Sequence, residues 1–551
     1  MKISKILLQN FKSFKSEAID VPDIMAFIGE NNAGKSNVLK ALELFFSETK
    51  TLEQHFFNDA KQKMVVQIWF RDLNDDAKKT FRKYLLDDSE TVIIRKEYFF
   101  EGEEKEKQKL FAVILGENFE DDKDKKDAIE ILDKEDISPF VSPDKHYFWK
   151  PNPFGWRNVA ASYLPDFLYV PAVKDIKEES KITEKSRFGQ IINAMLGSVL
   201  QDEELKKVNE QFSKLLMGEN ETQDGRIAQL KEFETSLSEK LSAHMKGTTL
   251  KLEVTPPNIK EVFQSGTKII VNDGVSTPIE TKGHGMQRSV IFVIFRAYAE
   301  LLKKEQEKAK ALIFGIEEPE LYLHPQMQRA MFALLKEIAK TDQVIFTTHS
   351  SFFVDMTDYK SICIAVKKDL ETGTKVIQYQ GEIFQEDEKK KQFRLITEFD
   401  PERNELFFGR KVILVEGDTE KVVLPLIAQK LKNDYVFYEH GFTVVECGSK
   451  DMIPFFARVL NKFRISYVVI HDKDNETDTS NKTIADEVAA SGGIGLIEIL
   501  DPKFETVCAN AGVAIPTGGS KPFNAFKVFK ELDQAMIPNR LKEIVEKIFE
   551  E

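Results

Sequence analysis

The stretch that decides the fold is Gly29-Glu30-Asn31-Asn32-Ala33-Gly34-Lys35-Ser36. It fits the pattern G-x-x-x-x-G-K-[ST], with a short apolar run before it at 24–28 and an amphipathic helical pattern after it. The glycines let backbone N–H groups curl around phosphate oxygens at the positive end of that helix. The pattern therefore predicts a P-loop, in which Lys35 neutralises the β- and γ-phosphates and Ser36 holds Mg²⁺. The predicted nucleotide contacts are Gly29, Asn32, Gly34, Lys35, Ser36 and Asn37.

A P-loop needs an acidic strand end, and the run Leu312-Ile313-Phe314-Gly315-Ile316 leads into Glu317 and Glu318. We expect Glu317 to contact Mg²⁺ through water and Glu318 to polarise the attacking water. Asp is the usual residue at the first position, so Glu317 departs from the common pattern. On these acids alone, a solvated acidic turn is the competing interpretation.

The distance between the two motifs points to a divided ATPase domain. Glu317 lies 288 residues after Gly29, farther than in a compact P-loop protein. The ABC-type heads of chromosome-maintenance and repair ATPases have such a split, with a large insertion. Two further motifs fit that class: the loop 282–289, which resembles an ABC signature, and His349, which resembles a switch histidine directed at the γ-phosphate. From the loop we expect nucleotide contacts by Gly283, Gly285, Gln287 and Arg288.

The signature loop has a consequence for assembly. In ABC heads this loop does not reach its own P-loop and closes on the ATP of a second head. We therefore expect a homodimer or a higher even-numbered oligomer. A helical, polar segment at about 173–246, whose apolar residues recur at spacings of three and four, either packs inward or meets a second copy of itself.

The remaining patterns alternate between strands and helices. Residues 2–28 read as two strands and a turn, and the charge-rich stretch 101–137 reads as a hairpin followed by a solvated helix. Such alternation predicts an α/β fold with a parallel sheet. Further strands are expected at 64–70, 91–100, 249–254, 268–278, 311–316 and 343–347, with helices at 289–302 and 325–339. After a charge-rich connection at 381–399, a second unit has strands at 411–415, 443–446, 467–471 and 496–500.

The second unit carries its own set of carboxylates. Glu416 follows the apolar run 412–415, and Glu420 lies one helical turn later. Asp472 and Asp474 follow the run 467–470 and are two residues apart, so both point into one crevice at the carboxyl ends of the strands. Solvated acidic turns are the alternative for each motif taken alone.

Four converging carboxylates without a counter-charge repel one another, and divalent cations resolve that repulsion. An all-oxygen ligand set favours Mg²⁺ or Mn²⁺ over zinc. The site suits phosphodiester cleavage by two ions, one for the attacking water and one for the leaving oxygen. Lys521 follows a Gly-Gly-Ser turn and is a candidate to neutralise the developing charge, although an ordinary surface lysine is a nearly equal interpretation.

Composition limits the remaining choices. The 551 residues suggest three to four domains, and the formal net charge of −13 excludes DNA binding by overall basicity. A local basic contact is still compatible with that charge, with candidates Lys473, Lys521, Arg458, Lys462 and Arg464. Three widely spaced cysteines form no CxxC pair, which favours a reducing compartment. With no targeting or membrane-spanning pattern, we expect a soluble, cytoplasmic protein.

The combined motifs resemble the OLD (overcoming lysogenization defect) family of nucleases. The resemblance rests on 29–36, 282–288, the string Glu317-Glu318-Pro319-Glu320-Leu321-Tyr322-Leu323-His324-Pro325, His349, and the acids of 416–420 and 472–474. It implies an ABC-type ATPase in two parts, 1–172 and 249–380. It also implies a dimerising helical insertion at 173–248, a linker at 381–399 and a Toprim nuclease domain at 400–551.

The resemblance also implies roles for residues. Glu416, Glu420, Asp472 and Asp474 would be the metal ligands, and Glu416 and Asp472 would also be catalytic. Lys521 would be the catalytic lysine, in competition with Lys503 and Lys527. Glu505 would be a further member of the metal shell. The cofactors would be ATP with one Mg²⁺, and two Mg²⁺ or Mn²⁺ ions in the Toprim domain. The resemblance further implies anti-phage defence and an operon-encoded helicase-like or reverse-transcriptase partner.

Three other functions are alternatives to a metal-dependent nuclease. One is an ATP-driven DNA clamp with an inert Toprim unit, which the intact acid set disfavours. Another is a Toprim topoisomerase or primase, which the short chain after residue 400 disfavours because a topoisomerase needs a separate domain for its nucleophilic tyrosine. The third, an ABC transporter head, does not fit the Toprim partner or the missing membrane segment.

Overall fold

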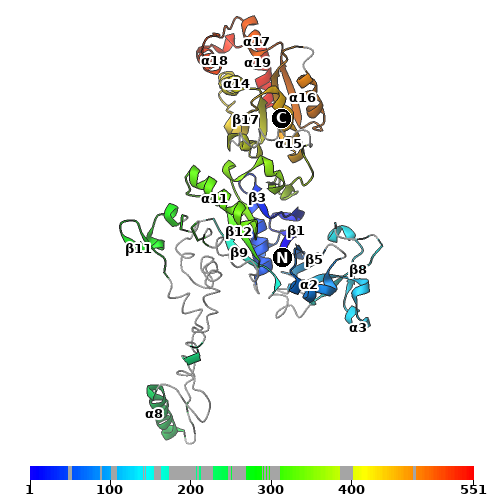
Figure 1. Ribbon diagram of the computed structural model, residues 1–551, viewed down its shortest axis with the longest axis vertical. Helices are drawn as coiled ribbons and strands as arrows, with labels where there is room; N and C mark the ends of the chain where they lie inside the picture. The colour runs from blue at the N-terminus through cyan, green and yellow to red at the C-terminus, as the bar shows by residue number, and fades with distance from the viewer. Residues whose placement is uncertain are drawn as a thin grey trace. The chain divides into compact units, whose positions relative to one another are not determined.

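The computed structural model divides the chain into two compact units. One comprises Met1–Phe167, Lys310–Glu320 and His324–Glu551, and the other comprises Leu168–Ala309 and Leu321–Leu323 (Figure 1). The residues that the structure describes are 1–47, 52–86, 90–100, 108–139, 142, 144–153, 163–172, 207, 210–211, 228–245, 248, 250, 268–287, 289–290, 293–294, 297, 311–384, 401–475 and 479–550.

Some expectations lie outside these residues. They are the strand at 249–254, most of the helix at 289–302, Arg288, most of the insertion at 173–248 and most of the connection at 381–399.

A mainly parallel sheet carries the P-loop, as the alternating pattern predicts. Its order is β15-β14-β3-β13-β12-β9, and β3 lies parallel to both β13 and β14. The strands are β3 (Ile24–Ile28), β9 (Asp166–Val170), β12 (Leu312–Glu317), β13 (Gln343–Thr347), β14 (Ile362–Val366) and β15 (Lys375–Ile377). Helix α1 (Lys35–Phe46) follows β3, and α11 (Pro325–Ile338) connects β12 to β13. Because β3, β13 and β12 are parallel, the segments that follow them emerge at one edge of the sheet.

A second sheet in the same unit is antiparallel, with the order β2-β1-β4-β5-β6-β8-β7. Its strands are β1 (Lys2–Phe11), β2 (Phe14–Asp20), β4 (Met64–Arg71), β5 (Val92–Tyr98), β6 (Gln108–Leu115), β7 (Ile129–Glu130) and β8 (Tyr147–Pro151). The expectation of two strands in 2–28 was wrong, because Lys12 and Ser13 turn the chain tightly between β1 and β2 and leave β3 as a third strand.

The charge-rich stretch 101–137 also differs from its prediction. The hairpin between β5 and β6 is present, but the helix that follows is only α3 (Asp122–Lys125), and the short strand β7 comes next. All residues of β6 from Leu110 to Leu115 are buried. Helix α2 (Asp75–Phe81) follows β4 and precedes β5 in the sequence.

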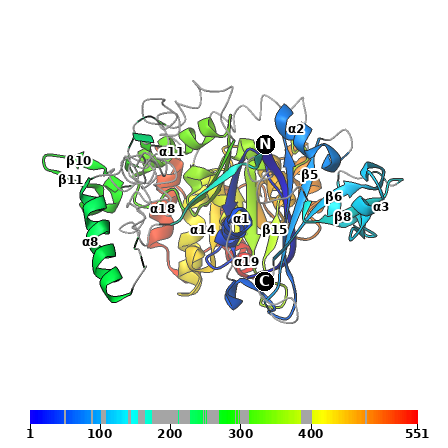
Figure 2. The same cartoon turned by 90° about the horizontal axis from the view of Figure 1, so that it is seen from below.

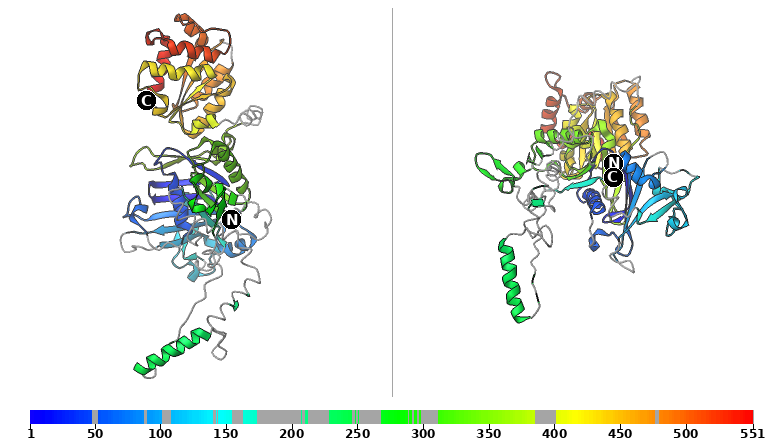
Figure 3. Two further views of the ribbon diagram at one scale, coloured as in Figure 1. Left: turned by 90° about the vertical axis from the view of Figure 1, so that its left-hand side faces the viewer. Right: turned by 60° about the horizontal axis from the view of Figure 1, so that its bottom comes forward.

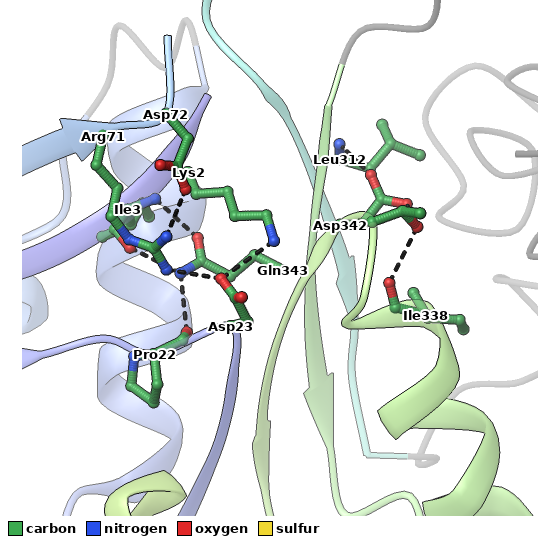
Figure 4. A network of polar contacts seen from close by, with 11 residues as sticks. Lys2, Ile3, Pro22, Asp23, Arg71, Asp72, Leu312, Ile338, Asp342 and Gln343 are labelled. Atoms are coloured by element: carbon green, nitrogen blue, oxygen red, sulfur yellow. Dashed lines mark hydrogen bonds and ion pairs between the residues drawn. The ribbon is translucent and has the colours of Figure 1, made fainter. Parts of the chain in front are cut away.

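A polar network joins the two sheets where both begin (Figure 4). The buried side chain of Gln343, the first residue of β13, accepts from Ile3 N at 2.8 Å and donates to Ile3 O at 2.7 Å. It also donates to Pro22 O at 2.9 Å. Next to it, Asp23 forms ion pairs with Lys2 at 3.1 Å and Arg71 at 2.6 Å, and these lysine and arginine contacts hold the pKa of Asp23 below its usual value. The amide of Gln343 thus fixes β1 against the start of the parallel sheet.

The other unit is described in part. It contains α8 (Ala228–His244), a continuous helix, and a hairpin of β10 (Ile270–Asn272) and β11 (Ser276–Pro278), seen in Figures 2 and 3. The apolar spacing predicts the helix correctly. Phe233, one of the apolar residues of the predicted stripe, is 57% exposed.

The C-terminal segment forms a four-stranded parallel sheet of order β17-β16-β18-β19. Its strands are β16 (Lys411–Val415), β17 (Phe442–Glu446), β18 (Ser466–Asp472) and β19 (Gly495–Leu500), so all four predicted strands are confirmed. Short helix α13 (Pro401–Asn404) precedes the sheet. The central strands β16 and β18 are buried on both faces, as continuous apolar runs require.

Alternate residues of these strands pack into two separate cores. Val412 and Val469 belong to a core with α15 (Ile453–Phe463) and α16 (Thr479–Ala489). Ile413 and Ile470 belong to a core on the other face. That face is covered by α14 (Asp418–Leu431), α17 (Phe504–Asn510), α18 (Lys521–Glu531) and α19 (Asn539–Phe549), as Figure 1 shows. Among the described residues, no helix is long and apolar enough to cross a membrane.

Candidate active sites

The loop at 29–34 has the backbone that its glycines allow. Gly29 and Gly34 have φ values of 135° and 100°, in the region that favours glycine, and Gly34 caps the N-terminus of α1. A Cβ on Gly34 would lie 2.6 Å from Thr374 Oγ1 and 2.7 Å from Ser13 Oγ. The loop is thus held closely against its neighbours, and a side chain at Gly34 is excluded.

The residues of the predicted phosphate site lie along this loop and the first turn of α1. Lys35 is buried, and its Nζ donates to Gly29 O and Glu30 O, both at 2.9 Å. Burial lowers the pKa of Lys35. Asn32 adopts a φ of 64°, and Ser36 is half-buried. Asn37 Nδ2 donates to Ser13 Oγ at 2.9 Å, which gives Asn37 a role in holding the β1–β2 turn beneath the loop.

The predicted acids lie at the neighbouring strand ends. Glu317 is buried at the end of β12. Glu318 has a φ of 44°, and its N–H donates to Thr347 O at 2.9 Å, which ties the acid to the end of β13. The negative charge of Glu318 raises the pKa of both Lys35 and His349 against the effect of burial. The structure therefore brings Lys35, Glu318 and His349 into one electrostatic environment.

Glu320 is a site residue to which sequence reasoning assigned no role. Its Oε1 accepts from the backbone N–H of His349 at 2.7 Å, and its charge acts on Lys35. Burial raises the pKa of Glu320, and burial together with the charge of Lys35 lowers that of His349. Glu320 thus positions the backbone of the switch histidine. Its position three residues after Glu317 was a signal, but its partner follows from the parallel pairing of β12 and β13.

The signature-like loop lies in the other unit. Gln287 is buried, and its Nε2 donates to Lys282 O at 2.7 Å, across the turn that contains Gly283 and Gly285. Lys282 forms an ion pair with Asp273 and donates to Val275 O at 3.0 Å, which fastens the loop to the β10–β11 hairpin.

The second acidic set gathers at the carboxyl ends of β16 and β18. Glu416 follows β16, and burial raises its pKa against the effect of a hydrogen bond from the backbone N–H of Asp472. Asp472 ends β18, and its Oδ1 accepts from Phe504 N at 2.8 Å. Burial and, to a smaller extent, the charges of Glu416, Glu505 and Asp474 together raise the pKa of Asp472 to about 6. Glu416, Glu505 and Asp474 therefore each lie within electrostatic reach of Asp472.

Glu420 lies in the first turn of α14 and is buried. Burial raises its pKa to about 7, and the charges of Asp472 and Glu416 act in the same direction. Asp474 has a φ of 59°, which returns the chain after β18, and its charge raises the pKa of Glu416. Each of the four predicted ligands therefore interacts electrostatically with at least one other.

The chemistry of these four carboxylates suits a divalent cation. The Oε2 atom of Glu416 is buried, with no hydrogen-bond partner among the described residues. Mutually repelling carboxylate oxygens with such an unused acceptor are the ligands that Mg²⁺ and Mn²⁺ prefer. As placed in the structure, however, no three acidic, His or Cys side chains of the described residues stand at metal-ligand spacing.

Lys521 is the lysine that the structure joins to the acids. It begins α18 and forms an ion pair with Glu505, and its pKa is raised by Glu505, Glu420 and Asp472 against the effect of burial. Of the two competing lysines, Lys503 precedes α17 and acts on Glu505 through its charge, whereas Lys527 lies over the ring of Phe523. The geometry therefore favours Lys521.

A second lysine in this site was missed. Lys450 follows β17 and is buried, and its Nζ donates to Asp474 Oδ2 at 2.9 Å and to Lys473 O at 3.2 Å. Its charge also opposes the rise that burial causes in the pKa of Glu416. Lys450 therefore supplies a positive charge next to two predicted metal ligands and fixes the turn that carries Asp474.

Two family models match the parts of the chain that contain these residues. The protein-family model of the AAA ATPase domain matches residues 1–354. The model of the overcoming lysogenization defect protein-like TOPRIM domain matches residues 407–474, which contain both predicted strand-end motifs. The chain is an OLD-family ATPase with a Toprim domain. It is accordingly an enzyme that combines an ATPase with a Toprim nuclease domain, and it uses a nucleotide and a divalent metal.

Curated relatives carry matching names. The chain is 25% identical over 491 residues to the Old nuclease of Escherichia phage P2, and the aligned region covers 86% of this chain and 77% of that protein. It is 30% identical over 295 residues to the OLD nuclease of Thermus scotoductus, covering 50% of this chain and 53% of that one. Endonuclease GajA of Bacillus cereus VD045 is 23% identical over 500 residues, covering 88% and 77%. Among solved structures, an SMC head domain from Thermotoga maritima aligns with 69% of this OLD-family chain and 100% of its own, at 14% identity and a TM-score of 0.33.

The raised pKa values predict that metal binding to the Toprim domain of this OLD-family protein depends on pH. Metals bind the deprotonated carboxylates, so protons on Glu420 and Asp472, with pKa values of about 7 and about 6, compete with the ion. We expect Mn²⁺ affinity to rise by at least about tenfold from pH 5.5 to pH 7.5 and then to level off. Calorimetry without nucleotide measures this, and an affinity that is constant across the range would contradict the expectation.

Lys450→Met should weaken the same site. The substitution removes the charge that holds Asp474, so we expect cleavage and Mn²⁺ affinity to fall by about 10- to 100-fold, as for partners that orient metal ligands. For Mn²⁺ affinity, Lys473→Met is the matched control, because the ammonium of Lys473 pairs with Asp501 at 2.9 Å rather than with a predicted ligand. Equal Mn²⁺ affinities for the two variants would show that Lys450 does not position Asp474.

Proposed function

We propose that this protein cleaves DNA phosphodiester bonds at the carboxylates of its Toprim domain and hydrolyses ATP in its head. The observation that carries the proposal is the convergence of Glu416, Glu420 and Asp472 at the carboxyl ends of β16 and β18, with Lys521 beside them. The nuclease names of the relatives support the same activity.

In the Toprim site we assign Glu416, Glu420, Asp472 and Asp474 to hold two Mg²⁺ or Mn²⁺ ions, with Glu505 at the edge of the set. When bound, such ions activate water and stabilise the leaving oxygen. Lys521 neutralises charge that develops on the phosphate, and Glu505 orients its ammonium through their ion pair. The Phe504 N–H holds the Asp472 carboxylate in a fixed orientation.

In the ATPase head, Gly29, Asn32, Gly34 and Lys35 cradle the phosphates, and Ser36 and Glu317 hold the Mg²⁺ of ATP. Glu318 orients the attacking water, and His349 senses the γ-phosphate from a position fixed by Glu320. Burial and the charge of Lys35 lower the pKa of His349, which keeps its ring neutral and able to accept or donate a hydrogen bond.

We further propose the assembly that these parts require. The ATPase comprises 1–172 and 249–380, with a dimerising insertion at 173–248, a linker at 381–399 and the Toprim domain at 400–551. In a homodimer or higher even oligomer, Gly283, Gly285, Gln287 and Arg288 would close on the partner's ATP. Light scattering with and without ATP tests this, and a monomer under both conditions would remove it.

The biological setting is proposed on the family resemblance. It places the enzyme in the cytoplasm, in anti-phage defence, with DNA as substrate and an operon-encoded helicase-like or reverse-transcriptase protein as a further partner. The connection to phage is supported by the similarity of this chain to the Old nuclease of Escherichia phage P2.

Incubation of the purified protein with supercoiled plasmid tests the activity. We expect nicked or linear plasmid in Mg²⁺ or Mn²⁺ and intact plasmid in EDTA, because the carboxylate site needs divalent ions. Reactions with and without ATP show whether the head activates or restrains cleavage. A preparation that hydrolyses ATP but leaves plasmid, linear and single-stranded DNA intact in every metal would overturn the nuclease proposal.

A further inference from the structure

Helix α18 connects the predicted nuclease site to the surface of the Toprim domain. Its first residue, Lys521, pairs with Glu505 among the acids. At its other end, Lys430 near the end of α14 donates to Lys530 O at 2.9 Å and to Leu532 O at 2.6 Å. These bonds join the far ends of α14 and α18, and the two helices lie side by side (Figure 1). Because Glu420 is in the first turn of α14, both helices start at the acidic site. Helix α18 therefore leads away from the predicted reaction centre.

The outward side of α18 combines aromatic and basic residues. Ala525 and Phe529 are buried against the domain, whereas Phe523 is 58% exposed. Lys527 and Lys530 are exposed and share a face with Phe523 at helical spacing. Lys527 Nζ lies 5.8 Å from the centroid of the Phe523 ring, and Lys530 Nζ lies 5.7 Å from that of Phe526. We call Phe523, Phe526, Lys527 and Lys530 the α18 face.

The charge of the α18 face contrasts with that of the whole chain. The protein has a formal net charge of −13, yet α18 contains three lysines and one acid, Glu531. Within the part of the chain that the structure describes, neither Lys527 nor Lys530 forms an ion pair. Other basic candidates are engaged: Arg458 pairs with Glu487 at 2.7 Å, and Lys473 pairs with Asp501.

Exposed lysines interleaved with aromatic rings are the pattern that holds single-stranded nucleic acid. Lysines attract the phosphates, and a ring stacks on a base of any sequence. From Lys521 to Lys530 the helix rises by about 13.5 Å, which is long enough to follow a few nucleotides of one strand. The turn before α18, at Gly518 and Gly519, is open: a Cβ at either glycine would meet nothing within 4 Å.

We propose that the α18 face binds a single strand of DNA that leads to the nuclease site, with Phe523 stacked on a base. The proposal rests on the proposed function and deepens it, because it identifies the surface that holds the substrate. Lys527 and Lys530, about one and two helical turns after Phe523, contact successive phosphates on one side of the stacked base. Single-stranded DNA or an opened strand is therefore the preferred substrate, since a base inside a duplex does not offer its face to the ring.

The stacking contact is tested with the full-length protein by fluorescence anisotropy, using a short single-stranded oligonucleotide and a duplex of the same sequence. All variants carry Asp472→Asn to prevent cleavage. We expect Phe523→Ala to lower single-strand affinity by about tenfold, Phe523→Trp to restore it, and duplex affinity to change by less than about twofold. Because Phe523 is exposed, its replacement removes little packing, and an unchanged circular dichroism spectrum and melting temperature verify the fold.

The charge contacts are tested by salt titration of the same single strand. Each phosphate contact contributes about 0.7 to the slope of log affinity against log salt, so Lys527→Gln should lower that slope by about 0.7. Lys482→Gln is the matched control, because Lys482 is an exposed lysine on α16, which covers the other face of the sheet. Equal slopes for the two variants would overturn the proposal.

The outcomes distinguish a failure of the α18 face from a failure of the nuclease proposal. Metal-dependent cleavage by the otherwise wild-type enzyme, together with unchanged single-strand affinity of Phe523→Ala, would refute the α18 face and leave the nuclease proposal standing. If the wild-type enzyme neither binds nor cuts DNA, both proposals are wrong.

Discussion

Asp472→Asn is expected to abolish DNA cleavage while ATP hydrolysis continues. Asparagine keeps the shape of the side chain and the oxygen that accepts from Phe504 N, so the fold around α17 should persist. It removes the negative charge at the centre of the acidic set, where Glu416, Asp474 and Glu505 all act on Asp472. Metal ions at such a site supply several kcal/mol of transition-state stabilisation, so we expect cleavage to fall by at least about 10³-fold.

A plasmid-nicking time course measures the loss, and phosphate release measures the ATPase. Asp434→Asn is the matched control, because it is the same change at an exposed aspartate of the Toprim domain. If Asp472→Asn cut plasmid at the wild-type rate in both Mg²⁺ and Mn²⁺, the Toprim unit would not be the nuclease. The clamp reading, in which ATP drives DNA binding and the Toprim domain is inert, would then be the better account.

Lys35→Ala has the second large effect, on the other site. The ammonium of Lys35 lies within the loop, bound to Gly29 O and Glu30 O, and is positioned to exchange these carbonyl oxygens for phosphate oxygens. Without its charge, we expect ATP hydrolysis to fall by about 100-fold or more. Affinity for a fluorescent ATP analogue should weaken as well.

Lys40→Ala, on the same helix α1, is the control for general effects of losing a lysine there. Mn²⁺ binding to the Toprim domain in the absence of nucleotide should be the same for Lys35→Ala and the wild type. Wild-type rates of ATP hydrolysis by Lys35→Ala would show that this loop is not the site of hydrolysis.

Contiguous motifs could be predicted from the sequence. The P-loop is one uninterrupted pattern, and its strand and helix, β3 and α1, are found where apolar periodicity predicts them. The C-terminal strands β16 and β18 are long apolar runs that end in acids, so both the strands and the convergence of Glu416 with Asp472 could be inferred.

Contacts between distant segments could not be predicted. Lys450 enters the site because the sheet order places β17 next to β16, and a lysine after a short strand carries no signal of that order. Glu320 acts on His349 because β12 and β13 are parallel neighbours. In the N-terminal region, the turn at Lys12 and Ser13 lacks the usual Gly or Pro, so two strands read as one.

The central claim is that divalent ions bind at the Toprim carboxylates, where DNA is cut. Anomalous diffraction at the manganese edge, from crystals of the enzyme soaked in Mn²⁺ without nucleotide, tests it most directly. The account predicts peaks beside Glu416, Glu420 and Asp472 that disappear in Asp472→Asn crystals. Crystals of a preparation that cuts DNA in Mn²⁺ but show no peak at these three side chains would contradict it.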